Sequence, residues 1–344
     1  MGVQITELLE KKHITFKDLY GKTIAIDAPL FLHQFLSTIR QRDGSLLVDS
    51  KGNVTSHLMG LFTRTTNLLE KGIKLIYVFD GKPPELKKRT TEMRKSIKIE
   101  AEKKYEEAAE RGDLEEMRKY AARTSKLTPE MIEEAKQLIA AFGLPIVQAL
   151  SEGEAQAAYI VKKGEAYAVG SQDADCMLFG ATRMVRNLNI TARKKVARTL
   201  SYTAIEPELI QLSEVLNSLG IDQKQLIAMA MLVGTDFNQK GIKGIGPKNA
   251  LKMVKNYKHN FDALFKEAKW DEQFDFSWQE VFDVIEKMPV TDEYSLTPKS
   301  ISAEKIKELL CEKHEFSEER VNSMLSKITK IVEKKEQKGL GEFF

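Results

Sequence analysis

Cysteine is scarce in this chain, which has only Cys176 and Cys311 among its 344 residues. Two cysteines leave no disulfide framework and no cluster of thiolates for a structural zinc ion, and this favours an intracellular protein. Long apolar runs are missing as well, because the longest, residues 226–233, is far shorter than the ~20 residues that span a bilayer. The N-terminus has no apolar segment typical of a signal peptide. We therefore expect neither a disulfide-rich secreted protein nor a membrane partner.

A large net charge of one sign is also absent. The chain has 53 basic and 50 acidic residues, which leaves a net charge of +3. The basic residues are concentrated locally: residues 82–98 hold seven of them against two acids, and residues 239–258 hold six lysines and no acid. Such local excesses can follow a phosphate backbone, although a solvated helix face is the commoner cause of any single charged run.

The first part of the chain alternates between strand and helix patterns. Short segments rich in β-branched and apolar residues predict strands at residues 23–28, 74–80, 144–150 and 166–171. Helical spacing at residues 58–72, and a capped segment from Thr128 to Gly143, predict helices between them. This alternation predicts an α/β fold with a mostly parallel central sheet flanked by helices.

Two other parts of the chain have different patterns. Residues 82–127 are rich in Lys, Arg, Glu and Ala and poor in β-branched residues, which predicts one or two exposed helices inserted between strands. From about Asp222 onward the pattern is helical throughout. The sequence therefore predicts a helical insertion in an α/β region, followed by a helical C-terminal region.

Acidic residues lie at the ends of the predicted strands or directly after them. These residues are Asp27, Asp80, Glu152, Glu154, Asp173 and Asp175, and Asp236 follows the apolar helix at 226–233. Because an open parallel sheet binds ligands outside the carboxyl ends of its strands, we expect these side chains to converge on one edge. Each also has a plainer explanation, since Ser151-x-x-Glu154 is a capping box and an aspartate after a strand is common in turns.

A cluster of carboxylates needs cations or protonation to be stable. Two like charges ~4 Å apart repel by roughly 4 kcal/mol at an effective dielectric of 20. Ligands that are all oxygen suit Mg²⁺ or Mn²⁺. Two such ions ~4 Å apart form a clamp for the in-line attack of water on a phosphodiester. The acids therefore predict a two-metal phosphodiesterase.

Several long motifs occur in order along the chain. They are TIAIDA, TSHLMGLFTRT, YVFDGKPPELK, SEGEAQAAY, SQDADCMLFG, VRNL and GTDFNQKGIKGIGPKNAL. Together they resemble the structure-specific 5′ nuclease (XPG-like) superfamily, and most closely its flap endonucleases, over the range from Gly2 to Phe344. The resemblance implies Mg²⁺-dependent cleavage of DNA at the base of a 5′ flap, with an associated 5′–3′ exonuclease activity, in Okazaki fragment maturation and DNA repair.

The resemblance also implies roles for single residues at the reacting phosphate. It implies one metal cluster of Asp27, Asp80, Glu152 and Glu154, and a second of Asp173, Asp175 and Asp236, with two Mg²⁺ ions that Mn²⁺ can replace. Lys87 and Arg94 match two basic residues that reach the scissile phosphate, and their spacing of seven puts them on one helix face. Residues 82–127 match the helical arch through or under which the flap passes.

Further positions match residues that face DNA in this family. They are Gly2, His33, Arg40, Thr55, Arg64, Arg186, Gly241, Lys243, Gly244, Gly246 and Lys248. Residues 241–248 match a helix–hairpin–helix that grips duplex without reading sequence and implies a bound K⁺, whereas the plainer interpretation is a Gly-rich turn. His33 departs from the family, which usually has a stacking tyrosine there, and imidazole is smaller and titrates near neutrality.

The last eight residues, QKGLGEFF, match the peptide pattern that docks on a sliding clamp (PCNA). The implied anchors are Gln337, Leu340, Phe343 and Phe344. The plainer interpretation is a disordered tail with two aromatic residues. The chain has no basic segment after this motif, which is typical of the archaeal type.

The implied organisation is an N-terminal nuclease region at 1–98 with the arch at 82–127, an internal nuclease region at 144–236, a helical DNA-binding region at 237–330 and a flexible tail at 331–344. We expect a monomer on branched DNA with a 5′ flap, in the cytoplasm (nucleoid) of an archaeon or the nucleus of a eukaryote. A related 5′ exonuclease, bubble-cutting nuclease or junction nuclease is an alternative. A non-catalytic clamp-bound DNA adaptor is another, and a metal-dependent cleavage assay distinguishes it.

Overall fold

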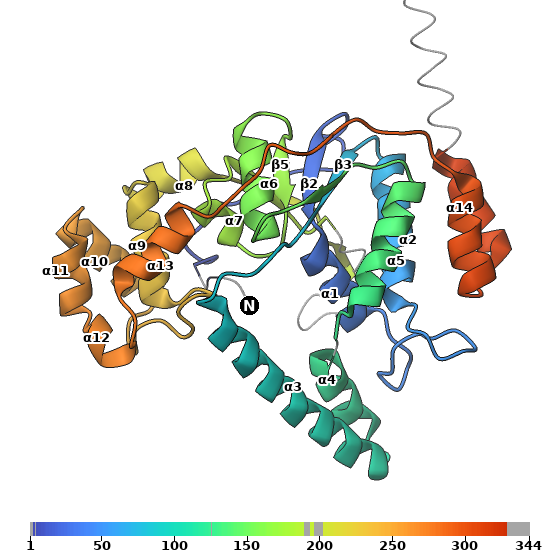
Figure 1. The fold of residues 1–344 in the computed structure, drawn as a ribbon, viewed down its shortest axis with the longest axis horizontal. Helices are drawn as coiled ribbons and strands as arrows, with labels where there is room; N and C mark the ends of the chain where they lie inside the picture. The colour runs from blue at the N-terminus through green and yellow to red at the C-terminus, as the bar shows by residue number, and fades with distance from the viewer. Residues whose placement is uncertain (1–2, 4, 125, 189–192, 196–201, 329–344) are drawn as a thin grey trace, which may run out of the picture.

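The structure is a computed structural model that describes residues 3, 5–124, 126–188, 193–195 and 202–328. Its strands are β1 (Lys12–His13), β2 (Thr23–Asp27), β3 (Lys74–Phe79), β4 (Ile146–Gln148), β5 (Ala168–Gly170), β6 (Arg183–Arg186), β7 (Arg193–Lys195), β8 (Tyr202–Ala204) and β9 (Glu208–Gln211). Seven of them form one sheet in the order β1-β9-β6-β5-β2-β3-β4, and β7 pairs with β8 (Figure 1). The strands from β6 to β4 are parallel, whereas β9 and β1 join antiparallel at one edge. The predicted mostly parallel sheet is confirmed.

Helices flank this sheet. They are α1 (Ala28–Thr38), α2 (Ser56–Glu70), α3 (Lys87–Glu110), α4 (Leu114–Thr124), α5 (Pro129–Ala141), α6 (Gly153–Lys162), α7 (Asp175–Leu178), α8 (Leu212–Leu219), α9 (Gln223–Val233), α10 (Pro247–Tyr257), α11 (Phe261–Glu267), α12 (Trp270–Gln273), α13 (Trp278–Glu286) and α14 (Ala303–Lys307). A π-helical turn, Glu308–Lys313, follows α14. Among the described residues, no helix combines the length and the apolar character that a bilayer crossing requires.

The predicted strands and helices are present, with shifted ends. Each of the four predicted strands is shorter than its apolar segment, and the fourth is reduced to Ala168–Gly170. The α5 helix begins where predicted, because the Thr128 side chain accepts a hydrogen bond from the Met131 N–H at 3.3 Å. It ends before Gly143, whose φ is 70° and where a Cβ would lie 2.2 Å from the Lys299 carbonyl oxygen. The short strands β6 and β9, of four residues each, were not predicted.

The insertion between β3 and β4 contains two helices. α3 and α4 pack against each other as a hairpin that projects away from the sheet (Figure 1). Gly112 makes the turn between them with a φ of 67°, a left-handed conformation that glycine adopts without strain. The predicted helical insertion is therefore confirmed as a protruding helical hairpin.

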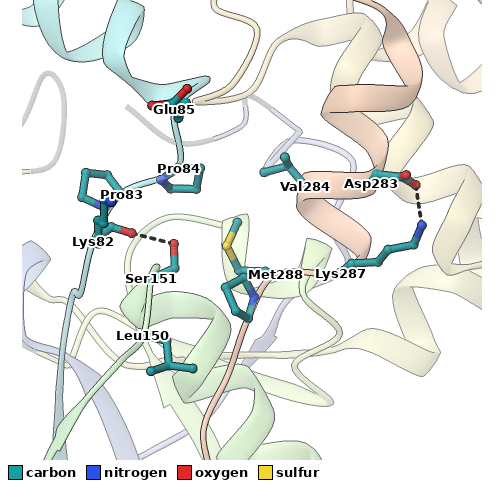
Figure 2. A pocket seen from close by; sticks show the side chains of 11 residues that line it. Lys82, Pro83, Pro84, Glu85, Leu150, Ser151, Asp283, Val284, Lys287 and Met288 are labelled. Atoms are coloured by element: carbon teal, nitrogen blue, oxygen red, sulfur yellow. Dashed lines mark hydrogen bonds and ion pairs between the residues drawn. The ribbon is translucent and has the colours of Figure 1, made fainter.

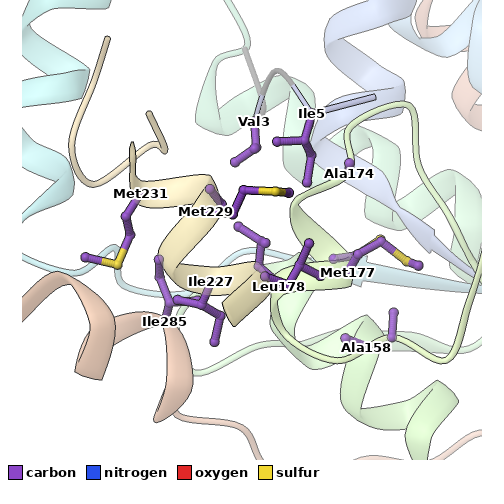
Figure 3. Close-up of a cluster of buried hydrophobic side chains, with 14 of the residues drawn as sticks. Val3, Ile5, Ala158, Ala174, Met177, Leu178, Ile227, Met229, Met231 and Ile285 are labelled. Carbon is purple, nitrogen blue, oxygen red and sulfur yellow. The ribbon is translucent and has the colours of Figure 1, made fainter. Parts of the chain in front are cut away.

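A continuous apolar core joins the helical C-terminal region to the sheet. Ile227 and Met229 of α9 lie beside Met177 of α7, and Val3 and Ile5 reach the same cluster from the N-terminus (Figure 3). All five side chains are at most 3% exposed. Burying side chains of this size contributes about 1.5–3 kcal/mol each, so this packing holds α9 against α7.

Candidate active site

The carboxyl ends of the parallel strands bring the predicted acids to one edge. Asp27 is the last residue of β2 and caps α1, where its Oδ1 accepts from the Leu30 N–H at 3.1 Å. Asp80 follows β3, and its Oδ1 accepts from the Gly153 N–H at 2.7 Å. A Cβ on Gly153 would lie 2.8 Å from that same oxygen, so any larger residue there would displace the Asp80 carboxylate. The end of β3 and the segment after β4 are therefore joined at the start of α6.

Helix α6 supplies two acids, and the capping-box interpretation of one of them is wrong. The N-cap of α6 is Glu152, and Ser151 Oγ donates instead to the Lys82 carbonyl at 3.0 Å. Glu154 lies in the first turn, where one carboxylate oxygen is 3.4 Å from Ser171 Oγ. Its carboxylate is therefore turned to the end of β5 and does not cap its own helix.

The remaining acids come from α7 and from the segment after α9. Asp173 precedes α7, and Asp175 begins it and accepts from the Val3 N–H at 2.7 Å. Asp236 lies in a turn that Thr235 and Asn238 hold, since Thr235 Oγ1 is 2.7 Å from Asn238 Oδ1. One hollow is lined by Glu152, Glu154, Asp175 and Asp236 together. Acids from α6, α7 and the helical C-terminal region therefore face a common space.

The electrostatics of this edge are those of crowded carboxylates. Burial and the neighbouring Asp80 and Asp173 raise the pKa of Asp27 well above its usual value. Burial and Asp175, Asp27 and Asp173 raise the pKa of Glu154 in the same way. Burial raises the pKa of Asp175 to about 7, against the hydrogen bond from Val3. The cluster therefore carries more negative charge than its surroundings stabilise, which favours bound cations.

Lys87 places a positive charge in this cluster. It begins α3, and its ammonium donates to Glu152 and lies 3.6 Å from Asp236 Oδ2. Burial acts to lower the pKa of Lys87, but Glu152, Asp236 and Asp80 outweigh burial and the pKa is raised. One turn along α3, Thr90 Oγ1 donates to the Asp236 carbonyl at 2.5 Å. The sequence analysis missed Thr90, although its spacing of three from Lys87 puts both on one helix face.

The donor set suits a hard divalent cation. Every predicted ligand is a carboxylate, the type of ligand that Mg²⁺ and Mn²⁺ prefer. Within the described part of the chain, no three His, Cys, Asp or Glu side chains are arranged closely enough to hold a metal ion as they stand. In the structure the Lys87 ammonium pairs with both Glu152 and Asp236, so a positive charge already lies between these two carboxylates. The residues therefore fit a divalent cation by donor chemistry and by charge.

We call the cluster of the seven predicted acids the acidic edge: Asp27, Asp80, Glu152, Glu154, Asp173, Asp175 and Asp236. The predicted DNA-facing residues lie elsewhere, in varied surroundings. His33 is exposed on α1, and Thr55 is the N-cap of α2. Arg64 is largely buried in α2, and burial lowers its pKa to about 10. Arg40 Nη1 donates to the Gly44 carbonyl at 2.7 Å. Arg186 Nε donates to the Gln172 carbonyl at 3.2 Å, so this arginine also supports the loop before Asp173.

Some predicted residues lie outside what the structure describes. The backbone of Arg94 belongs to α3, but its side chain is outside the described part of the structure. Gly2 and the four tail residues, Gln337, Leu340, Phe343 and Phe344, lie outside the described residues altogether. Their roles remain predictions.

The predicted hairpin loop connects α9 to α10. Gly241 has a φ of 56°, and a Cβ there would lie 2.3 Å from the Val233 carbonyl carbon. Gly244 has a φ of 87° and open space beside it, and Gly246 is the N-cap of α10. Lys243 on this loop and Lys248 in the first turn of α10 are exposed. The loop therefore presents backbone, two lysines and a helix N-terminus to solvent, which together suit a phosphate group.

Comparison with known proteins identifies the class of this fold and site. Residues 1–101 match the family model described as XPG N-terminal domain, and residues 143–236 match the XPG I-region. The described acids lie in these two regions, and the inserted helical hairpin lies mainly between them. The catalytic core of Rad2 in complex with a DNA substrate shares the fold, with a TM-score of 0.68 at 22% identity over 94% of this chain and 97% of that one. The fold and the acidic edge thus define an XPG-type nuclease.

Full-length relatives narrow this class to one family. Flap endonuclease 1 from Pyrococcus abyssi is 52% identical over 344 residues, which cover 100% of this chain and 98% of that protein. Flap endonuclease 1 from Thermococcus onnurineus is 51% identical, with 100% and 99% covered. The solved flap endonuclease-1 from Methanococcus jannaschii has a TM-score of 0.76 at 42% identity, covering 97% of this chain and 100% of that one. The chain belongs to the flap endonuclease 1 family.

Proposed function

We propose that this protein hydrolyses the phosphodiester at the base of a 5′ flap in branched double-stranded DNA, as a Mg²⁺-dependent enzyme with an associated 5′–3′ exonuclease activity. The observation that carries the proposal is the single edge on which acids from β2, β3, α6, α7 and the segment after α9 meet, at the root of a helical hairpin. We place its action in Okazaki fragment maturation and DNA repair, in the nucleoid of an archaeal cell, because its relatives from Pyrococcus and Thermococcus are flap endonucleases.

Each part of the chain has a different proposed role. The nuclease regions at 1–98 and 144–236 supply Asp27, Asp80, Glu152 and Glu154 to one metal and Asp173, Asp175 and Asp236 to the other. When bound, two such ions activate the attacking water and stabilise the attacking and leaving oxygens. The arch at 82–127 brings Lys87 and Arg94 to the scissile phosphate, and the region at 237–330 grips the duplex through the Gly241–Lys248 loop with a K⁺ ion.

Lys87 has two states in this proposal. Without substrate its ammonium is bonded to Glu152 and is close to Asp236, so it balances part of the carboxylate charge. With the carboxylates holding divalent cations, the Lys87 ammonium would be available to donate to the phosphodiester, whose charge grows as it is attacked. Thr90, one turn further, keeps the root of the arch against the Asp236 backbone.

The substrate class is tested by offering four DNAs side by side at equal concentration. These are a double flap, a blunt nicked duplex, a bubble and a four-way junction. The proposal expects the highest single-turnover rate on the double flap with Mg²⁺. Faster cleavage of the nicked duplex indicates an exonuclease, and faster cleavage of the bubble or the junction indicates the corresponding superfamily member. Binding without cleavage of any of them indicates a DNA adaptor.

The hairpin loop gives a prediction about salt. Lys243→Ala with Lys248→Ala should weaken binding to flap DNA of every sequence alike, because these exposed lysines contact phosphates and not bases. The slope of log affinity against log salt should flatten by ~1 per lysine, since fewer counterions are released. Fluorescence anisotropy from 50 to 300 mM KCl measures it. Lys17→Ala, at an exposed position before β2, is a control for loss of a lysine, and an unchanged slope in the double variant contradicts the assignment.

The tail gives a prediction about a protein partner. Phe343→Ala with Phe344→Ala should eliminate binding to a sliding clamp, because two buried rings supply roughly 1.5–3 kcal/mol each of a micromolar interaction. Tethering raises the local concentration of enzyme at a nick, so clamp stimulation should also disappear. Calorimetric titration and cleavage with and without clamp measure both effects. Clamp-free cleavage should stay unchanged, and undiminished clamp binding by the double variant rejects this role.

A further inference from the structure

An extended segment connects the duplex-gripping helices to the C-terminal helices. Residues 289–301, which we call the strap, run without helix or strand from α13 to α14. Figure 1 shows the strap crossing the molecule past α6, on the side of the sheet away from the helical hairpin. The strap follows directly after α13, and α13 packs on α9, which leads into the hairpin loop.

A buried glutamine of α6 fixes the start of the strap. Gln156 is 0% exposed, and its amide makes both of its bonds to the backbone of one strap residue. Gln156 Nε2 donates to the Thr291 carbonyl at 2.9 Å, and the Thr291 N–H donates to Gln156 Oε1 at 2.8 Å. A side-chain amide that pairs with a backbone amide in both directions fixes position as well as orientation.

The same face of α6 holds the next strap residues. Tyr159 donates its hydroxyl to the Asp292 carboxylate at 3.0 Å, and Lys163 Nζ donates to Asp292 Oδ1 at 2.8 Å. Gln156, Tyr159 and Lys163 are spaced at i, i+3 and i+7, which puts them in one row along the helix. We call this row the α6 strap site.

The other end of α6 carries the acids. Glu152 is the N-cap residue of the helix, Glu154 lies in its first turn, and the Gly153 N–H binds Asp80. Helix α6 therefore holds two proposed metal ligands at its start and the strap along its length. A rigid helix that binds both fixes the distance between the acidic edge and the segment that leads to α13.

The end of α13 has space around it where the strap begins. An open hollow of about 540 Å³ lies between Pro83 and Pro84, at the root of the arch, and Val284 of α13 with Met288 just after it (Figure 2). Leu150, just before α6, forms another wall. The hydrogen bonds between Gln156 and Thr291 follow within a few residues along the chain from the α13 residues that line this hollow.

We propose that Gln156, Tyr159 and Lys163 are positioning residues that set the register between the duplex-gripping region and the acidic edge, and thereby select which phosphodiester is cut. The proposal rests on the proposed flap cleavage. Successive phosphates along one DNA strand rise by 3.4 Å, so a displacement of about that size brings the neighbouring phosphodiester to the acids. The strap site opposes such a displacement through the bonds to Thr291 and Asp292.

The test reads the products of single-turnover cleavage of a labelled double flap at one-nucleotide resolution. Gln156→Leu keeps the volume but leaves the Thr291 amide without its partner, and it should raise the fraction cut at neighbouring phosphodiesters about tenfold. Asp292→Ala removes the exposed partner of Tyr159 and Lys163 without touching α6 or its buried face. It should raise the same fraction about threefold, and Asp292→Glu should restore the wild-type pattern.

Controls separate positioning from stability and from the proposed function itself. Glu133→Ala removes a comparable exposed pair with Lys136 on α5, 3.0 Å apart, and should leave the cut site unchanged. If Gln156→Leu does not fold, the cut-site distribution of Asp292→Ala tests the inference by itself. A lowered melting temperature with the wild-type cut site, or miscutting equal to that of Glu133→Ala, overturns the inference. Failure of the wild-type protein to cut any flap refutes the proposed function, which is a separate outcome.

Discussion

Asp175→Ala and Asp80→Ala should each abolish cleavage of flap DNA while leaving its binding nearly intact. In the structure both carboxylates lie at the acidic edge, where Asp175 accepts from Val3 and Asp80 from Gly153. Losing a ligand weakens the binding of a divalent cation. A bound cation contributes several kcal/mol by stabilising the charge that develops in the transition state. We expect the single-turnover rate to fall by about 10³ or more, since 1.36 kcal/mol corresponds to a factor of ten.

The measurement is rapid-quench cleavage in Mg²⁺ beside anisotropy binding of the same DNA. Titration with Mn²⁺ provides a second readout, and it should show weaker metal binding by both variants. Glu319→Gln, an exposed acid of the C-terminal helical region, is a control for loss of one charge and should cut at the wild-type rate. Full cleavage by Asp175→Ala or Asp80→Ala in Mg²⁺ would contradict the assignment of these acids as metal ligands.

Lys87→Met should lower the single-turnover rate far more than it weakens DNA binding. The methionine side chain keeps most of the length but removes the ammonium that lies between Glu152 and Asp236. Losing one preorganised charged donor commonly costs on the order of 10²–10³ in rate. Arg94→Ala should behave in the same way, as a separate prediction from the spacing along α3.

Two variants distinguish chemistry from anchoring at the root of the arch. Lys87→Arg keeps a positive charge and should retain part of the rate, whereas Lys82→Met removes an exposed cation from the segment before α3 and should affect mainly binding. Equal losses of rate and of affinity in Lys87→Met would show that this lysine only anchors DNA.

The acidic edge could be predicted from the sequence because strand direction determines it. Asp27, Asp80 and Asp173 each follow a short apolar segment, and parallel strands place their carboxyl ends together. The helical insertion was predictable for a similar reason, since the composition of residues 82–127 leaves no apolar alternation for a strand. Local patterns were sufficient in both cases.

Contacts between distant residues could not be predicted in this way. The Val3 N–H binds Asp175 across 172 residues, and Gln156 binds Thr291 across 135. Neither pair leaves a local signal, because the residue spacing within one segment does not reveal which distant segment it contacts. The capping-box interpretation of Ser151 was wrong for the same reason: the hydroxyl is bound to the distant Lys82 carbonyl. The strap was included in a region expected to be helical throughout, although residues 289–301 contain no helix.

The central claim is that carboxylates at the end of a parallel sheet cut branched DNA at a flap base with the help of divalent cations. The most direct measurement is single-turnover cleavage of a synthetic double flap by the wild-type protein, with and without Mg²⁺, and with the product length read to one nucleotide. We expect one dominant product at the flap base, formed only with the metal and lost on chelation. Cleavage that persists at the same rate after chelation, or products spread along the flap and the duplex, would contradict it.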